Sequence, residues 1–346
     1  MYSFKLKCNG QLHKMMDLKV VVVVVALMAQ VQLSVQLRFN HPLHGVVDRI
    51  NQKAKGSYIG LVMAYSTEEA ALQATGHFVP SLDIPWVDLA GRRFNIGKIK
   101  GVDVIYVKSG EEMLNAGITV QILVDAFDIK GIVHYGIAGS ANASLSIGDV
   151  GVLNDVAFTG SWNWKEFKAE EGTLPELKFG AFNVPENCQN LLANIEFTSQ
   201  QLFSVGKPVE DVFWQPIEPK WLSIASQLQN LTLQQCLKTY CLPKAPQIVY
   251  GLRGSTDNIF LDNEAYRDFL FNQFNISIVD EESVAIVATS RTNGVPSIVF
   301  RGVSDSASGE NKLSEPSLSS LAAANAVTAA LEFIGLLGQK SMVDDH

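Results

Sequence analysis

Several sequence features that define common classes of enzyme are missing from this chain of 346 residues. It has no Gly-x-Ser-x-Gly nucleophile elbow and no phosphate loop with its lysine. The histidines show no zinc-ligand spacing beyond the weak pair His41 and His44, so no metal and no bound cofactor is expected. No linker rich in Pro, Gly or Ser divides the body of the chain, which favours one domain.

Positive charge is also scarce. The chain has 27 basic and 35 acidic residues, and without its first 35 residues it would keep 23 and 34, a net charge of −11. That balance repels phosphate backbones, which argues against nucleic acid as a partner.

The N-terminus has the pattern of a secretory signal peptide. Lys14 and Lys19 precede the apolar run Val20–Met28, and Gln30 and Gln32 interrupt the softer stretch behind it. A basic flank and a short apolar core are typical of a signal peptide, whereas a spanning helix needs about 20 apolar residues. We therefore predict a signal peptide over residues 1–35, with an uncleaved membrane anchor as the alternative. Cleavage would leave no membrane segment and send the protein to the cell wall or the vacuole.

Secretion predicts glycosylation and disulfide bonds. Asn-x-Ser/Thr triplets begin at Asn142, Asn230 and Asn275. Cys8 precedes the predicted cleavage site, which leaves three cysteines and room for at most one disulfide within the chain. Cys236 and Cys241 are the nearest pair, and Cys188 with either of them is the alternative.

The body of the chain predicts an α/β fold. After an N-terminal segment, residues 36–56, short apolar runs alternate with helical patterns through residues 57–338. The run 58–64 is apolar throughout, which predicts a first strand buried on both faces. Leu318–Leu337 predicts a long closing helix.

Two segments depart from this alternation. Gly136–Ser140 follows a predicted strand, Gly131–Tyr135, and reads as a glycine-rich turn where the backbone approaches a ligand closely. Residues 160–185 read as an inserted surface loop, whose Trp162 and Trp164 are either packing anchors or ligand contacts.

Three acidic residues follow core strands and are candidates for catalysis. They are Glu68, Glu282 and Asp305. Acids at the ends of core strands can converge on one pocket. The alternative is that Glu68 and Glu282 favour helix N-termini and Asp305 caps a turn.

Four segments in the right order resemble the nucleoside phosphorylase and nucleosidase superfamily. They are Ile59-Gly60 to Thr67-Glu68, Gly136-Ile-Ala-Gly-Ser140 continuing to Leu145-Ser-Ile-Gly-Asp-Val150, Val279-Asp-Glu-Glu-Ser-Val-Ala285, and Val299-Phe-Arg-Gly-Val-Ser-Asp305. Within that superfamily, three features look most like plant bark and vegetative storage proteins. They are the signal peptide, the Trp-Asn-Trp insertion and the amino-acid sequence of the turn that contains Ile137. The resemblance implies a three-layer α/β/α sandwich with a mixed central sheet, and a homo-oligomer with pockets near subunit contacts.

The resemblance also implies roles for single residues. Asp305 would protonate N7 of a purine, and Glu282 would bind the ribose hydroxyls. Glu68 would take a proton from water in a hydrolase or contact the sugar in a phosphorylase. Arg301 would help to hold the attacking water or anion, and Phe260, or Ile259 one residue earlier, would pack against the base.

Departures from the family pattern weaken the expected phosphate site. After Gly136 the turn has Ile137 in place of Ser or Thr, and His134 stands where phosphorylases often have arginine. Glu281 replaces the methionine that normally lies against the ribose. A phosphate co-substrate would therefore find few donors besides the turn amides and His134.

Two functions follow from these observations. One is cleavage of the N-glycosidic bond of a purine-type nucleoside, by phosphate or by water. Its substrates would be adenosine, inosine or N6-substituted adenine ribosides. The other is a nutrient-storage protein that keeps the fold with reduced or no catalysis. Retention of Glu68, Glu282 and Asp305 favours the enzyme, because buried acids without a role cost stability.

Overall fold

A computed structural model describes residues 41–53, 57–166, 169–178, 193–237, 240–307 and 316–344. The predicted signal peptide and Cys188 lie outside these described residues.

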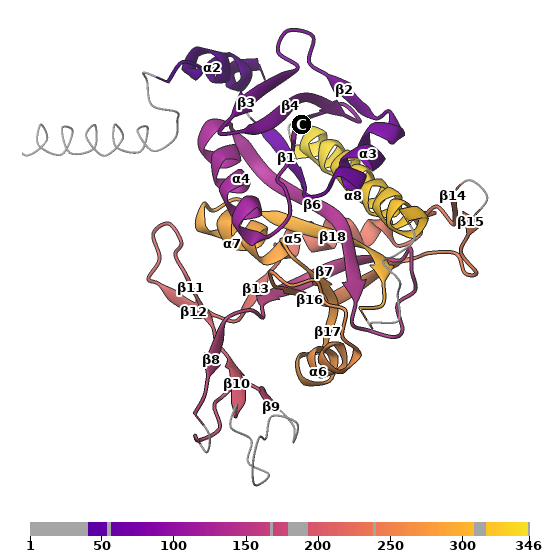
Figure 1. Cartoon of the computed structure of the whole chain (residues 1–346). Coiled ribbons are helices and arrows are strands. Elements are labelled where there is room, and N and C mark those ends of the chain that lie inside the picture. The colour runs from indigo at the N-terminus through magenta and orange to yellow at the C-terminus, as the bar shows by residue number, and fades with distance from the viewer. Residues whose placement is uncertain are drawn as a thin grey trace, which may run out of the picture.

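A mixed sheet of eleven strands forms the centre of the molecule (Figure 1). The strands are β1 (Tyr58–Met63), β2 (Phe78–Pro80), β3 (Trp86–Leu89), β4 (Arg92–Ile99), β5 (Val102–Lys108), β6 (Ile129–Ser140), β7 (Val150–Phe158), β13 (Trp214–Pro216), β16 (Ile248–Thr256), β17 (Ile276–Asp280) and β18 (Ser297–Asp305). The main path runs β13-β7-β16-β17-β6-β1-β5-β4-β2, and β3 pairs with β4.

Part of this sheet closes on itself. β18 pairs in parallel with β6 and antiparallel with β7, while β7, β16 and β17 lead back to β6. The five strands therefore form a ring, and β1 continues the sheet outward from β6. This ring brings the ends of β6, β17 and β18 close together, although they are far apart in the sequence.

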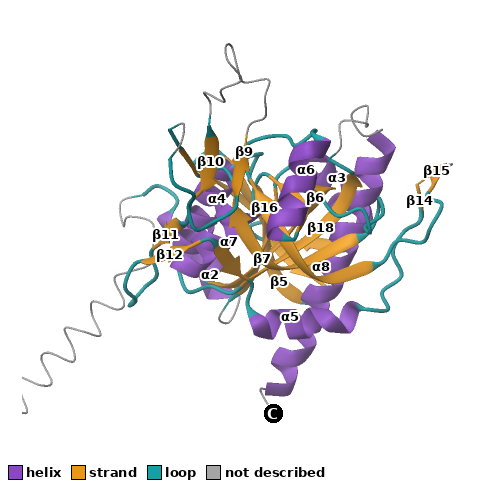
Figure 2. Cartoon of the chain, turned by 90° about the horizontal axis from the view of Figure 1, so that it is seen from below, coloured by secondary structure: helices purple, strands orange, loops and turns teal. Residues whose placement is uncertain are grey.

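Helices cover both faces of the sheet (Figure 2). On one face lie α3 (Ser66–Thr75), α5 (Pro219–Ala225), the 3-10 helix η2 (Ser226–Leu228) and α8 (Pro316–Asp344). The other face carries α2 (His44–Lys53), α4 (Met113–Ala126) and α7 (Ser283–Thr292). α6 (Glu264–Phe274) packs beside β17. The predicted three-layer α/β/α sandwich with a mixed sheet is confirmed.

The apolar pattern of the sequence explains most of these positions. Every residue of β1 is buried, as its unbroken apolar run predicts. α8 is also strongly apolar, because it packs against β18 and β6. Its segment Leu318–Lys340 is long and apolar enough to cross a membrane, but most of its apolar window is buried inside the protein. It therefore has the properties of a core helix.

The prediction of a glycine-rich turn at Gly136–Ser140 is wrong. Gly136–Ser140 continues β6, which runs unbroken from Ile129 to Ser140. The segment stays extended because β18 pairs with it on one side, Gly136 opposite Arg301, and β17 pairs with its last residues. Its glycines instead leave space on the face of the strand, as described below.

The inserted region forms a small sheet of its own, away from the central sheet (Figure 1). It comprises β8 (Trp162–Trp164), β9 (Glu176–Lys178) and β10 (Asn194–Phe197), followed by the hairpin β11 (Gln200–Leu202) and β12 (Glu210–Val212). Trp162 packs edge-on against Phe197, with ring centroids 6.4 Å apart. This contact supports the interpretation of Trp162 as a packing anchor.

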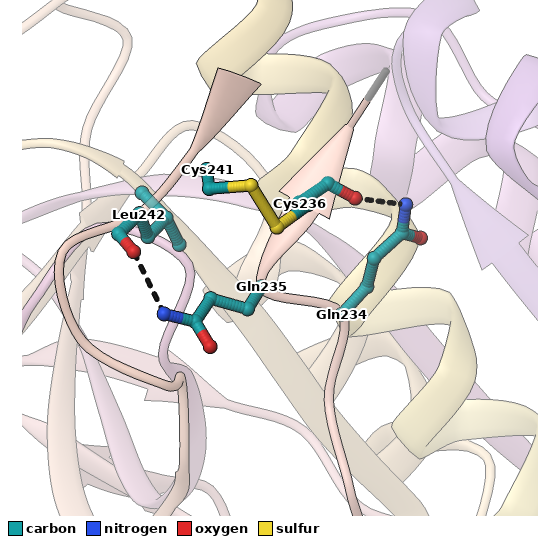
Figure 3. Close-up of a disulfide and its surroundings, with 5 residues drawn as sticks. All are labelled: Gln234, Gln235, Cys236, Cys241 and Leu242. Carbon is teal, nitrogen blue, oxygen red and sulfur yellow. Dashed lines mark hydrogen bonds between the residues drawn. A yellow bond between two sulfur atoms is a disulfide. The ribbon is translucent and has the colours of Figure 1, made fainter. Parts of the chain in front are cut away.

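A disulfide joins Cys236 and Cys241, which is the pairing predicted from their closeness in the sequence. It links β14 (Cys236–Leu237) to β15 (Tyr240–Cys241), a short hairpin that extends from the body (Figure 2). Two glutamine side chains brace it, since Gln234 donates to the carbonyl of Cys236 and Gln235 to that of Leu242 (Figure 3).

The three predicted glycosylation sites differ in their surroundings. Asn230 and Asn275 are exposed. Asn142 is half-buried, and its Nδ2 donates to the hydroxyl of Ser277. Glycosylation stays a prediction, and the structure favours Asn230 and Asn275 as acceptors.

Candidate active site

A cavity of about 510 Å³ lies where β1, β6, β17 and β18 end. Its walls include Ala64, Tyr65, Thr67, Glu68, Glu111, Ile137, Ala138, Gly139, Ile259, Phe260, Leu261, Val279, Asp280, Glu281, Glu282, Ser304, Asp305, Ser319 and Ser320. The cavity is large enough for a nucleoside-sized ligand. Six of the predicted site residues line it: Glu68, Ile137, Phe260, Glu281, Glu282 and Asp305.

Glu68 enters this cavity from the first turn of α3 and is almost fully buried. Its Oε2 accepts hydrogen bonds from the N–H groups of Ala64 and Tyr65, both 2.8 Å long. Its Oε1 accepts from the N–H of Ile137, also at 2.8 Å. Burial raises the pKa of Glu68, and the nearby Arg301 and these N–H groups oppose that shift. The carboxylate is thus held rigidly, with its pKa above the ordinary value.

Glu282 lies at the N-cap position of α7 and is also buried. Its Oε1 accepts from the N–H of Glu112, and its Oε2 accepts from Nη2 of Arg301 at 3.1 Å. Burial raises the pKa of Glu282 to about 7, although Arg301 acts in the opposite direction. Near neutral pH this group therefore changes between carboxylate and carboxylic acid.

Arg301 is fully buried beneath the cavity and does not line it. Its Nε lies 2.9 Å from Oδ2 of Asp280 and donates to the hydroxyl of Ser283, and its Nη1 donates to the carbonyl of Ile137. Nη2 is shared among Glu282, Ser283 and His134. The structure therefore places Arg301 where it orients the carboxylates, and not where it would hold an attacking water or anion.

Asp280 is the principal partner of Arg301 that the sequence analysis did not single out. Its Oδ1 accepts from the hydroxyl of Thr256 and from the N–H groups of Glu282 and Ser283. Burial acts to raise the pKa of Asp280, but Arg301 and these hydrogen bonds lower it below the ordinary value. The sequence does contain a clue to Asp280. This residue ends a buried strand and directly precedes the pair Glu281-Glu282 in the segment Val279–Ala285.

His134 does not reach the cavity. It is fully buried, with Nδ1 2.9 Å from the carbonyl of Val62 and Nε2 2.6 Å from Nη2 of Arg301. The expectation that His134 serves an anion in the cavity is therefore wrong. His134 faces Arg301, and the amide of Ile137 is already bonded to Glu68.

Asp305 is the last residue of β18 and is half-buried at the cavity wall. Its Oδ2 accepts from the hydroxyl of Ser304 at 2.8 Å, and its Oδ1 accepts from the N–H of Ala307 at 2.9 Å. These contacts fix the carboxyl group while its edge stays open to the cavity.

Gly136 does not line the cavity, but its missing side chain lets Glu68 and Arg301 pack closely together. A Cβ atom at this position would lie 2.2 Å from Nη1 of Arg301 and 2.5 Å from Oε1 of Glu68. Real Cβ atoms essentially never approach other atoms that closely. A larger residue here would therefore displace the two buried side chains that cross its face.

The segment Ile259–Leu261 forms an apolar wall of the cavity. Both Phe260, 67% exposed, and Ile259, 43% exposed, line it, so the structure leaves both as candidates for contact with a base. Glu281 and Glu111 add carboxyl groups. Burial, then Glu111 and Glu112, raise the pKa of Glu281.

The described lining has one sign of charge. It includes six carboxyl groups and no lysine, arginine or histidine. No cluster of three or more metal-ligating side chains was found among the described residues. The wall also includes Tyr65, Thr67, Ser304, Ser319 and Ser320, which were not predicted from the sequence, because single hydroxyl-bearing residues give no distinctive pattern.

A family model and related sequences place the chain in the same superfamily. The model of the phosphorylase superfamily matches residues 58–334. Bark storage protein A from Populus deltoides is 40% identical over 290 residues, which cover 83% of this chain and 91% of that protein. A 5'-methylthioadenosine/S-adenosylhomocysteine nucleosidase from Halalkalibacterium halodurans is 25% identical over 251 residues, covering 72% of this chain and 88% of that protein.

Solved structures share the fold. The 5'-methylthioadenosine/S-adenosylhomocysteine nucleosidase from Colwellia psychrerythraea, solved in complex with adenine, superposes with a TM-score of 0.59. The match covers 82% of this chain and 96% of that one, at 20% identity. At this level of identity the similarity concerns the fold alone.

Proposed function

Because the chain belongs to the phosphorylase superfamily, we propose that its cavity binds a purine-type nucleoside and cleaves the N-glycosidic bond with water. The observation that carries the choice of water over phosphate is the charge of the described lining, six carboxyl groups without a cation. A phosphate dianion would be repelled there, and Arg301 has its donors bonded elsewhere.

In this proposal three carboxyl groups each carry out one part of the reaction. Asp305 gives a proton to the purine base, which makes the base a better leaving group. Glu282 accepts hydrogen bonds from the ribose hydroxyls and stabilises positive charge as it develops on the sugar. Glu68, fixed by three N–H donors, takes a proton from the attacking water.

A second candidate is a nutrient-storage role, favoured by the 40% identity to bark storage protein A. Storage does not require catalysis, and an abundant enzyme can also serve as a reserve. The predicted signal peptide supports delivery to the secretory pathway in either case, with the cell wall or the vacuole as destination.

The deciding experiment measures free base released from a panel of purine ribosides by the purified mature protein, with and without phosphate. We expect phosphate-independent release that falls at least about 100-fold in Asp305→Asn, because the protonating group is lost. Asp88→Asn is the control, since Asp88 is exposed on β3 and paired with Arg93 far from the cavity.

Two other outcomes of this experiment would each support a different function. Release that requires phosphate would replace the hydrolase with a phosphorylase. No release from any riboside by the folded protein would leave storage as the better account.

A further inference from the structure

His134 is a buried polar residue that the proposed reaction does not use. It lies in the middle of β6, beneath the cavity, and its side chain has no solvent exposure. Each ring nitrogen has one close partner, the carbonyl of Val62 for Nδ1 and the guanidinium of Arg301 for Nε2. Burying a polar ring is costly unless both nitrogens are bonded, and here both are.

These partners fix the protonation state of the ring. A carbonyl oxygen only accepts hydrogen bonds, and a guanidinium group only donates them. The imidazole must therefore carry its proton on Nδ1 and offer a lone pair at Nε2. Burial first, then Arg301, lower the pKa of His134 to about 3, so the ring stays neutral in any ordinary assay.

His134 joins the two sides of the candidate site. On one side its bond to Val62 holds the end of β1, which leads into the N–H groups of Ala64 and Tyr65 that bind Glu68. On the other side it accepts from the same Nη2 that donates to Glu282. The remaining charged groups around Arg301 are Asp280 at the end of β17 and Glu68 itself.

We propose that His134 is a positioning residue that holds Arg301, and through it Glu282 and Glu68, in the geometry that glycosidic cleavage requires. This inference rests on the proposed function for its reaction. Its geometric basis is separate, since Nε2 of His134 makes the shortest contact with Nη2, at 2.6 Å against 3.1 Å for Glu282 and for Ser283.

Two amide variants test this proposal. The amide of Gln reaches the position of Nε2 and can accept from Arg301, whereas the shorter amide of Asn reaches only that of Nδ1 and can bond only Val62. We expect kcat/KM to fall about 100-fold in His134→Asn, because small displacements of catalytic groups have effects of this size. His134→Gln should stay within about tenfold of wild type.

Val133→Ala is the matched control for lost stability. Val133 is the fully buried neighbour on β6, and its side chain lies on the opposite face of the strand. The proposal is overturned if His134→Asn is no less active than Val133→Ala, or if His134→Gln is as inactive as His134→Asn.

A measurement without turnover separates this inference from the proposed function. Carbon-13 NMR of labelled glutamate carboxyl groups reports the pKa of Glu282 in the free protein. We expect this pKa to move by at least about half a unit in His134→Asn and to stay unchanged in His134→Gln and Val133→Ala. Inactive wild-type protein with this shift would sink only the proposed reaction, whereas an unchanged pKa in His134→Asn would overturn the positioning role.

Discussion

Three buried carboxyl groups share one cation at the centre of the site. Glu68, Asp280 and Glu282 all act on the pKa of Arg301, and only Asp280 keeps a pKa below its ordinary value. The lowered pKa of Asp280 follows first from Arg301, whose Nε lies 2.9 Å from Oδ2, and then from the hydroxyl and two N–H donors at Oδ1. Asp280 therefore neutralises Arg301, while Glu282 stays near the point where it gains or loses a proton.

The pKa of Glu282 predicts how ligand binding depends on pH. Above about pH 7 the group is a carboxylate, which in the proposed reaction accepts from ribose hydroxyls, and below that pH its proton must first leave. We expect the Kd of a purine ribonucleoside to tighten about tenfold between pH 6 and pH 8, as binding coupled to loss of one proton requires. Isothermal titration calorimetry with Asp305→Asn protein measures binding without turnover.

The matching control ligand is the 2',3'-dideoxynucleoside, which has no hydroxyl for Glu282. Its Kd should stay nearly constant over the same range. Equal pH dependence for both ligands would show that Glu282 does not contact the ribose.

At the scale of elements, the packing of α8 on β18 brings Ser319 and Ser320 to the cavity next to Asp305. Gly302 makes this close contact possible. A Cβ atom at this position would lie 2.2 Å from the carbonyl oxygen of Ala322 in the helix backbone. A helix backbone cannot move aside as a flexible side chain can.

Gly302→Ala should therefore push α8 away from the sheet. We expect a loss of about 3 kcal/mol in the free energy of unfolding, typical of overpacking in a core, together with weaker nucleoside binding. Urea unfolding measures the first effect. Gly45→Ala in α2 is the control, because nothing lies within 4 Å of its Cβ position and alanine favours a helix. Equal stability of the two variants would contradict the tight contact.

For the whole molecule, negative charge selects against negatively charged ligands. The formal net charge is −8, and six of the carboxyl groups counted in it line the cavity where a ligand would bind. Fields of this kind extend beyond single contacts and weaken with salt. Under the proposed function, a cavity of this sign is expected to favour neutral nucleosides over nucleotides.

We expect kcat/KM for adenosine 5'-monophosphate to be at least about 100-fold below that for adenosine, and the gap to narrow at high salt. Base release at low and high ionic strength measures it. 5'-Deoxyadenosine controls for loss of the 5'-hydroxyl without added charge. If 5'-deoxyadenosine is as poor a substrate as the nucleotide, charge is not the reason.

The sequence by itself determined the layers and the acids. Unbroken apolar runs such as Tyr58–Met63 predict strands covered on both faces. The order of the motifs was enough to indicate the family, its mixed sheet, and Glu68, Glu282 and Asp305 as candidates. These features depend on local pattern, which a sequence shows directly.

Only the tertiary structure decided how these groups are used. Gly136–Ser140 became a strand because β17 and β18 pair with it from distant parts of the chain. Arg301 turned beneath the cavity because Asp280, Ser283 and His134 surround it there. The strength of a charge depends on its burial and on partners brought together by folding, and neither can be read from the order of residues.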